Sequence, residues 1–108
     1  MRGRVKVFFD GGWRPATGME TAVVVRGREY VRRDLGPGNS MEAEWLALLD
    51  ALRVANELGL AEPVFLGDSL ATITRARRPA AGLAPLRLRH VKRTQNLAGI
   101  ALARLHER

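Results

Sequence analysis

The first third of the chain alternates short apolar runs with charged residues and glycines, a pattern typical of strands joined by turns. Three strands are predicted, over residues 4–10, 20–26 and 29–35, with a tight turn at residues 26–28. Because short turns join neighbouring strands, these segments are expected to form an antiparallel meander.

A long helix is predicted over residues 41–58, where apolar residues recur with the helical period. The preceding stretch "GPGNS" breaks the chain, Ser40 can cap the helix, and Gly59 can end it. On a helical wheel one side is polar and carries Glu42, Asp50, Arg53, Asn56 and Glu57. Glu44 lies nearly opposite, among apolar residues that are expected to face the sheet.

The remaining chain predicts a short buried strand over residues 63–67, a helix over about 69–78 and a strand over 86–91. Asp68 or Ser69 can cap the second helix, and a last helix is expected from about Thr94. Helix and strand alternate here, so the later strands are expected to run parallel through helical crossovers. The whole chain, 1–108, is expected to be a single domain, an α/β sandwich whose first half is the antiparallel meander.

Two of the buried-looking strands end on carboxylates, in "VKVFFDGG" and "VFLGDS". Asp10 and Asp68 are therefore expected at the edge of a sheet where ligands commonly bind. Each has a simpler explanation, since Asp68 can be a helix cap and Asp10 a turn acid. Glu44 can also merely complement the helix dipole. If the three acids converge, they form a site for a hard cation such as Mg²⁺, which prefers oxygen ligands.

Charge is distributed very unevenly along the chain. Residues 1–68 hold nine Lys/Arg and ten Asp/Glu, whereas residues 69–108 hold nine Lys/Arg and one acid, which together give the net charge of +7. Such asymmetry favours a polyanionic partner, with nucleic acid the commonest; the alternative is a solvated arginine-rich surface.

Three features that the sequence lacks bear on the expected cellular location of the protein. It contains no cysteine, no stretch of membrane-spanning length and no cleavable leader pattern, so no membrane partner and a cytoplasmic location are expected.

Four segments, taken in order, resemble the conserved segments of type 1 ribonuclease H: "FFDGG", "EAEWLALLDAL", "VFLGDSLATI" and "HVKRTQNLAGIALAR". The family's usual forms are an apolar strand with D-G-G/S, A-E-Y/M before an apolar helix, G-D-S, and V-x-R-x-x-N-x-x-A-D-x-L-A. The resemblance covers nearly the whole chain and implies the ribonuclease H-like fold, a five-stranded mixed sheet flanked by helices, with a three-strand antiparallel meander plus two parallel strands.

The resemblance also implies an activity, which is the metal-dependent hydrolysis of RNA in RNA–DNA hybrids. In that family four carboxylates hold two Mg²⁺ or Mn²⁺ ions that activate water and stabilise the leaving oxygen. Asp10, Glu44 and Asp68 match three of these ligands. Nucleic-acid contacts are implied or predicted at Gly11, Gly12, Asn39, Ser40, Arg93 and Asn96. Turns at the glycines and capping at Asn39 and Ser40 are the alternatives.

The fourth ligand is where this sequence departs from the family, because Ile100 occupies the position of the family's last Asp. Isoleucine offers no oxygen, so one of the two ions is expected to bind weakly unless Asn96, one turn earlier, contributes an oxygen. Two functions therefore stay open: a ribonuclease H, or a module that binds hybrid or double-stranded nucleic acid with impaired catalysis. In either case phosphate contacts are expected from Arg75, Arg77, Arg78, Arg87, Arg89, Lys92 and Arg93, and Trp13 is expected in an exposed loop.

Overall fold

The structure is a computed structural model that describes residues 4–106. Its strands are β1 (Val5–Arg14), β2 (Gly18–Val25), β3 (Arg28–Arg32), β4 (Pro63–Gly67) and β5 (Leu88–His90). Its helices are α1 (Ser40–Glu57), α2 (Leu70–Arg77) and α3 (Leu97–Leu105), with short 3₁₀ helices at Pro79–Ala81 and Arg93–Gln95. Within residues 4–106, no helix has the length and apolar character needed to cross a membrane.

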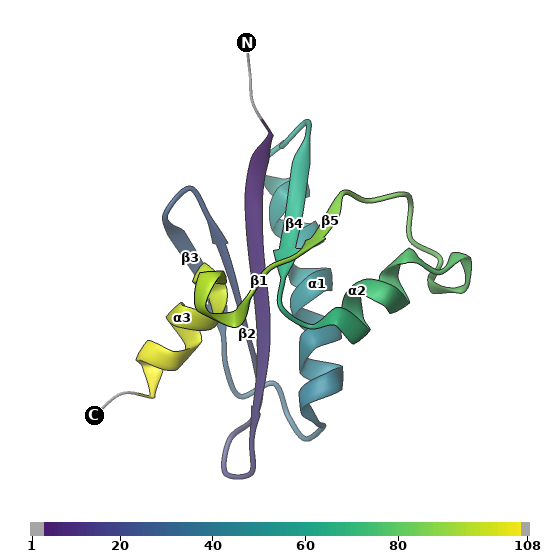
Figure 1. Ribbon diagram of the computed structural model, residues 1–108. Coiled ribbons are helices and arrows are strands. Elements are labelled where there is room, and N and C mark those ends of the chain that lie inside the picture. Colours follow the sequence, from purple (N-terminus) through teal and green to yellow (C-terminus); the bar gives the residue numbers. More distant parts are fainter. Residues whose placement is uncertain (1–3, 107–108) are drawn as a thin grey trace.

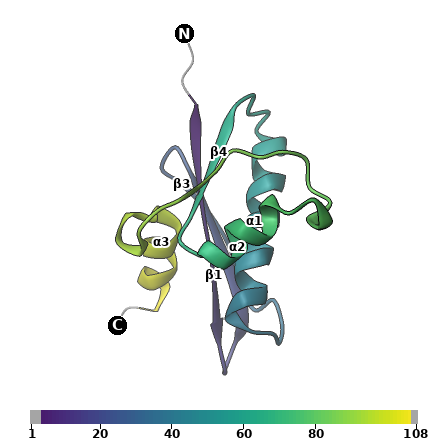
Figure 2. The ribbon, with the colours of Figure 1, turned by 45° about the vertical axis from the view of Figure 1, so that its right-hand side comes forward.

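The five strands form one sheet in the order β3-β2-β1-β4-β5. The pairs β1–β2 and β2–β3 are antiparallel, and β1–β4 and β4–β5 are parallel. This arrangement confirms the predicted five-stranded mixed sheet, with an antiparallel meander followed by two parallel strands. Figures 1 and 2 show α1 and α2 on one face of the sheet and α3 on the other.

Alternation along the central strand divides the core between these two faces. Val7 and Phe9 of β1 are buried in the larger cluster beneath α1, together with Leu48. Phe8 points the other way and packs against the smaller cluster that α3 covers, which includes Leu102. Since Asp10 is two residues after Phe8, the strand period places it on the α3 face.

Strand β1 is longer than the sequence predicted, so Asp10 does not end it. The strand continues through both glycines and Trp13 to Arg14, because it forms a hairpin with β2 in which Asp10 pairs with Ala22. Trp13 is accordingly in a strand rather than a loop, although its side chain is 41% exposed. The parallel pairing of β1 with β4, by contrast, ends two residues before Asp10, where Phe8 lies opposite Leu66.

Two details of α1 also differ from expectation. Its N-cap is Asn39, whose Oδ1 accepts a 2.8 Å hydrogen bond from the Glu42 amide, and Ser40 is the first residue of the helix. Asp50, predicted on the polar side, is buried. It accepts hydrogen bonds from Thr21 and Arg32 at 2.6 and 2.8 Å, so the sheet supplies the donors that a buried carboxylate requires.

The last helix begins later than predicted. A 3₁₀ turn at Arg93–Gln95 precedes it, and Asn96 is its N-cap, with Oδ1 accepting from the Ala98 amide at 3.1 Å. The second helix likewise starts at Leu70, capped by Ser69 rather than Asp68. Asp68 therefore keeps its carboxylate free of a capping role.

Candidate active site

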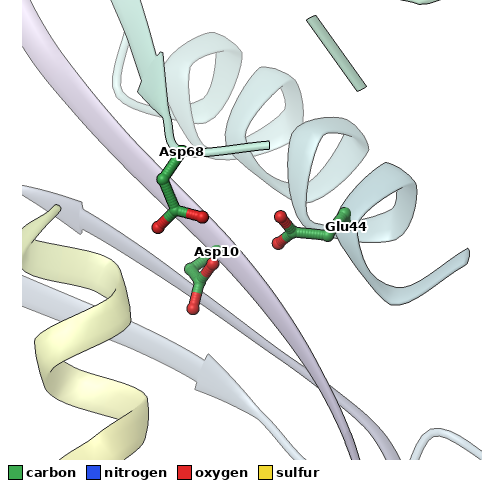
Figure 3. A group of neighbouring side chains, drawn as sticks. All are labelled: Asp10, Glu44 and Asp68. Carbon is green, nitrogen blue, oxygen red and sulfur yellow. The ribbon is translucent and has the colours of Figure 1, made fainter. Parts of the chain in front are cut away.

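Three carboxylates from distant parts of the chain meet beside the sheet. Figure 3 shows Asp10, Glu44 and Asp68 pointing toward one another from β1, from α1 and from the loop after β4. One ligand oxygen from each lies within 4.8 Å of the others. In residues 4–106 no other group of three or more such ligands is this close. The cleft that they line has a volume of about 310 Å³.

Parallel pairing and one close backbone contact produce this convergence. The β1–β4 register places Phe8 beside Leu66, so the acids two residues further on each strand come out at the same edge. Gly11 lets α1 approach β1, because a Cβ there would overlap the backbone of Ala43. The Gly11 amide also donates a hydrogen bond to Glu44 Oε1, which fixes this carboxylate beside Asp10. A tight packing role for Gly11 is thus evident from the fold.

The three acids are electrostatically unfavourable together without a counter-charge. Burial, followed by repulsion from Glu44 and Asp68, raises the pKa of Asp10 from 3.8 to about 9. Burial also raises the pKa of Glu44 above its usual value, although the hydrogen bond from Gly11 opposes that rise. Arg93 lowers both pKa values through its positive charge. Because the three carboxylates repel one another, a bound cation would stabilise their ionised forms.

Asn96 is buried beneath the site and does not line the cleft. Its side chain has no exposed surface, and its amide nitrogen donates to Asp68 Oδ2 and to the Phe9 carbonyl, both at 3.0 Å. A fully buried amide that holds Asp68 cannot touch a nucleic acid. The predicted nucleic-acid contact at Asn96 therefore needs correction to a positioning role.

Helix α3 presents no acid to the cleft in the described residues. The α3 residue next to the carboxylates is Gly99, where an added Cβ would lie 3.3 Å from Asp10 Oδ2 and 3.7 Å from Asp68 Oδ2. Ile100 is 39% exposed and does not line the cleft. That Ile100 replaces an ancestral acid remains a prediction from the motif spacing.

Most of the other residues predicted to contact nucleic acid line the cleft, and one lies beside it. Its lining includes Gly11, Gly12, Trp13, Ser40 and Arg93. Asn39 is exposed nearby, where its amide nitrogen also donates to Glu42 at 2.9 Å. Whether these residues contact a nucleic acid remains a prediction.

A further acid lines the cleft, Glu20 of β2, which was not among the predicted site residues. It is 3% exposed and lies over Gly12, whose missing Cβ would come 3.3 Å from Glu20 Oε2. His106 Nε2 lies 2.8 Å from the same oxygen, and the guanidinium nitrogens of Arg14 and Arg33 lie 3.9 Å from its carboxylate. The strand pattern alone could have indicated an inward charge, but its nearest partner, His106, is 86 residues away in the sequence.

Comparison with solved structures shows which known proteins share this fold. No family model matches the chain, and no curated protein matches it. Among solved structures, ribonuclease H1 from the halophilic archaeon Halobacterium salinarum NRC-1 superposes with a TM-score of 0.68 at 26% identity, covering 94% of this chain and 99% of that one. In its fold the chain is similar to type 1 ribonuclease H.

Two more distant structures show the same fold. LC11-RNase H1 in complex with an RNA/DNA hybrid matches this ribonuclease H-like protein with a TM-score of 0.68 at 19% identity, covering 87% of this chain and 89% of that one. The N-terminal RNase H domain of rv2228c from Mycobacterium tuberculosis, solved as a fusion with maltose-binding protein, matches at 22% identity and a TM-score of 0.66. Coverage in that case is 95% of this chain and 96% of the other.

The donor set of this ribonuclease H-like protein fits a divalent metal ion. All three ligands are carboxylates, which suit hard cations such as Mg²⁺ or Mn²⁺. The elevated pKa values indicate that positive charge is missing from the cluster. Arg93, which lines the same cleft, offsets this repulsion only partly.

Proposed function

We propose that this protein is a divalent-metal-dependent endonuclease that hydrolyses the RNA strand of RNA–DNA hybrids. The observation that carries the proposal is the convergence of Asp10, Glu44 and Asp68 within 4.8 Å in a fold of the ribonuclease H1 type. A ribonuclease H1 with this fold has been solved in complex with an RNA/DNA hybrid, which supports the choice of substrate. Mg²⁺ or Mn²⁺ is the proposed cofactor, with the cytoplasm as the proposed location.

Each acid has a defined task in this proposal. Bound divalent ions would supply an activated water and stabilise charge on the leaving oxygen. Asp10, at the centre of the cluster, would hold metal from β1, and Glu44 and Asp68 would complete the ligand set. The Gly11 amide keeps Glu44 in place, and Asn96 does the same for Asp68, so neither ligand must reorganise when metal binds.

The basic surface would hold the substrate. Arg93 lines the cleft, where it can contact a phosphate beside the metal site. Gly11 and Gly12 line the cleft, so their backbone atoms are candidates for contact with the 2′-hydroxyls of the RNA strand. Ser40 lines the cleft and Asn39 lies exposed next to it, so both are candidates for further polar contacts.

A second function is favoured by one observation, the lack of a carboxylate from α3 in the cleft. With Gly99 facing the acids and Ile100 on the surface, one of two ions would have few protein ligands. The protein would then be a module that binds hybrid or double-stranded nucleic acid and cleaves it poorly or not at all.

Cleavage of an end-labelled RNA–DNA hybrid with Mg²⁺, Mn²⁺ or EDTA decides between the two functions. An enzyme should cut RNA only with metal, and Asp10→Asn should abolish cutting while hybrid binding persists. Asp34→Asn, a change at an exposed aspartate remote from the three acids in sequence, is the matched control and should cut normally. Binding without cuts in any metal would establish the module and reject the nuclease.

A gain-of-function variant tests the role of position 100. If Ile100 stands where the family's fourth acid acts, Ile100→Asp should raise the cleavage rate about tenfold or more, since a metal ligand would be restored. Leu49→Asp is the control, because Leu49 is an apolar residue of α1 with nearly the same exposure, 38%, and it does not line the cleft. Equal rates for the two variants would contradict the account of the missing ligand.

A further inference from the structure

Part of the sheet face that carries α3 is left open. Helix α3 covers β2 and the C-terminal half of β1, while the N-terminal half of β1, together with β4 and β5, has no helix in front of it (Figure 1). The chain between β5 and α3 crosses this face through the 3₁₀ turn Arg93–Gln95. The open area therefore lies on one side of the crossing segment, and the metal-ligand cluster lies on the other.

Two adjoining grooves occupy this open area and share Arg4, Lys6 and Phe8. One has a volume of about 620 Å³ and the other about 470 Å³. Lys6 and Phe8 belong to β1, where they pair with Val64 and Leu66 of β4. We call the two together the open-face groove; its remaining lining residues are Val5, Val24, Arg26, Gly27, Arg89, His90, Val91, Gln95 and Leu97.

The open-face groove combines an apolar floor with cationic rims. Val64 and Leu66 form a nearly covered floor, each 5% exposed, beside the half-buried ring of Phe8. Four exposed cations line it, Arg4, Lys6, Arg26 and Arg89, and no acid in residues 4–106 lines either part. Other arginines of the chain pair with acids, but none of these four forms an ion pair among the described residues. Unpaired positive charge on both rims of the groove favours the binding of an anionic ligand.

The dimensions indicate what kind of anion fits. Lys6 on β1 and Arg89 on β5 are separated by β4, so the rims are roughly 10 Å apart, which is two strand spacings. Arg4 directly precedes β1 and is two residues before Lys6, a separation of about 7 Å along the groove where the backbone is extended. One extended polynucleotide strand fits such a channel, with phosphates at the cations and bases over the apolar floor and Phe8.

We propose that the open-face groove binds single-stranded nucleic acid. Resting on the proposed function, the site gives the nuclease a second contact with substrates that carry a single-stranded overhang. The crossing segment links the two sites, because Arg93 lines the metal-ligand cleft whereas Val91 and Gln95 line the groove. A strand that leaves a hybrid in the cleft passes over exposed Lys92 and Arg93 into the groove.

The test measures binding of a dye-labelled, single-stranded oligonucleotide by anisotropy in EDTA, where no cleavage occurs. Lys6→Gln/Arg89→Gln should weaken binding about tenfold at 0.1 M salt and reduce the slope of log K against log salt by roughly 1.4, since each lost phosphate contact contributes about 0.7. The control is Arg53→Gln/Arg104→Gln, which removes the same charge from exposed residues on α1 and α3. The control should bind within about twofold of the unmodified protein, since its two cations lie outside the groove.

Further arms separate this proposal from the others. Both double variants should bind a blunt RNA–DNA hybrid equally well. If the unmodified protein does not bind the blunt hybrid, the proposed function is rejected, but the proposal for the open-face groove is not affected. Equal weakening of single-strand binding by both double variants would overturn the groove, as would no weakening by either. If neither double variant weakens binding, the cations would instead shield the apolar floor from water with their side-chain stems, or bind an acidic protein. If Lys6→Gln/Arg89→Gln unfolds, Arg26→Gln/Arg89→Gln tests the same rims and must weaken binding for the proposal to stand.

Discussion

Removing one charge from the acidic cluster should make the metal-free protein more stable. In EDTA, Asp10 is ionised in the unfolded chain above its ordinary pKa of 3.8, but folding raises that pKa to about 9. The folded state therefore favours the protonated acid, and stability contributed by this group is lost as pH rises from about 4 to about 9. Asp10→Asn keeps the shape of the side chain and has no proton to lose, so it escapes this penalty.

The size of the effect follows from the pKa difference. Each unit corresponds to about 1.4 kcal/mol, so at pH 7, roughly three units above the ordinary value, the penalty has a ceiling of about 4 kcal/mol. Water in the open cleft screens the half-buried carboxylate, and we expect about half of that ceiling to be measured. A gain of about 2 kcal/mol in a domain of this size raises Tm by roughly 10 °C.

The assay is thermal or denaturant unfolding of both proteins in EDTA between pH 4 and pH 8. The free-energy advantage of Asp10→Asn should be near zero at pH 4 and grow with pH, because only the unmodified protein must hold the extra charge. Asp34→Asn, at an exposed aspartate, should show no such growth. Mg²⁺ should stabilise the unmodified protein more than Asp10→Asn. An advantage that is absent at pH 8, or equal at all pH values, would refute the view that the three acids repel one another.

Three further changes test the residues that build the site. Asn96→Ala should lower the free energy of unfolding by about 1–3 kcal/mol and weaken Mg²⁺ binding in calorimetry, because Asp68 loses its buried donor. Gly11→Ala should cost more than about 3 kcal/mol in denaturant unfolding and reduce metal binding, since the new Cβ overlaps the backbone of Ala43. Asp50→Ala should cost about 3 kcal/mol in the same assay but leave metal affinity unchanged, because neither Asp50 nor its partners Thr21 and Arg32 line the cleft. A shift in metal affinity for Asp50→Ala, or none for Asn96→Ala, would contradict this division between support and site.

The sequence by itself determined the elements, their order and the three acids. Periodicity of two or of 3.6 residues is local, so it predicted the meander, the long helix and the strand Pro63–Gly67 with small errors at the ends. The helical wheel also placed Glu44 away from the polar side, and the structure brings it to the cleft. Motif order then supplied the family, whose fold the sheet order β3-β2-β1-β4-β5 reproduces.

Only the tertiary structure decided what each polar residue faces, because that depends on partners far away in sequence. Asp50 looked solvent-exposed on its own helix until β2 and β3 supplied Thr21 and Arg32 as donors. Asn96 looked like a substrate contact, yet the packing of α3 against β1 buries it against Asp68. The pairing of β1 with β2 carried the first strand past Asp10, since a hairpin is stabilised across strands rather than along one.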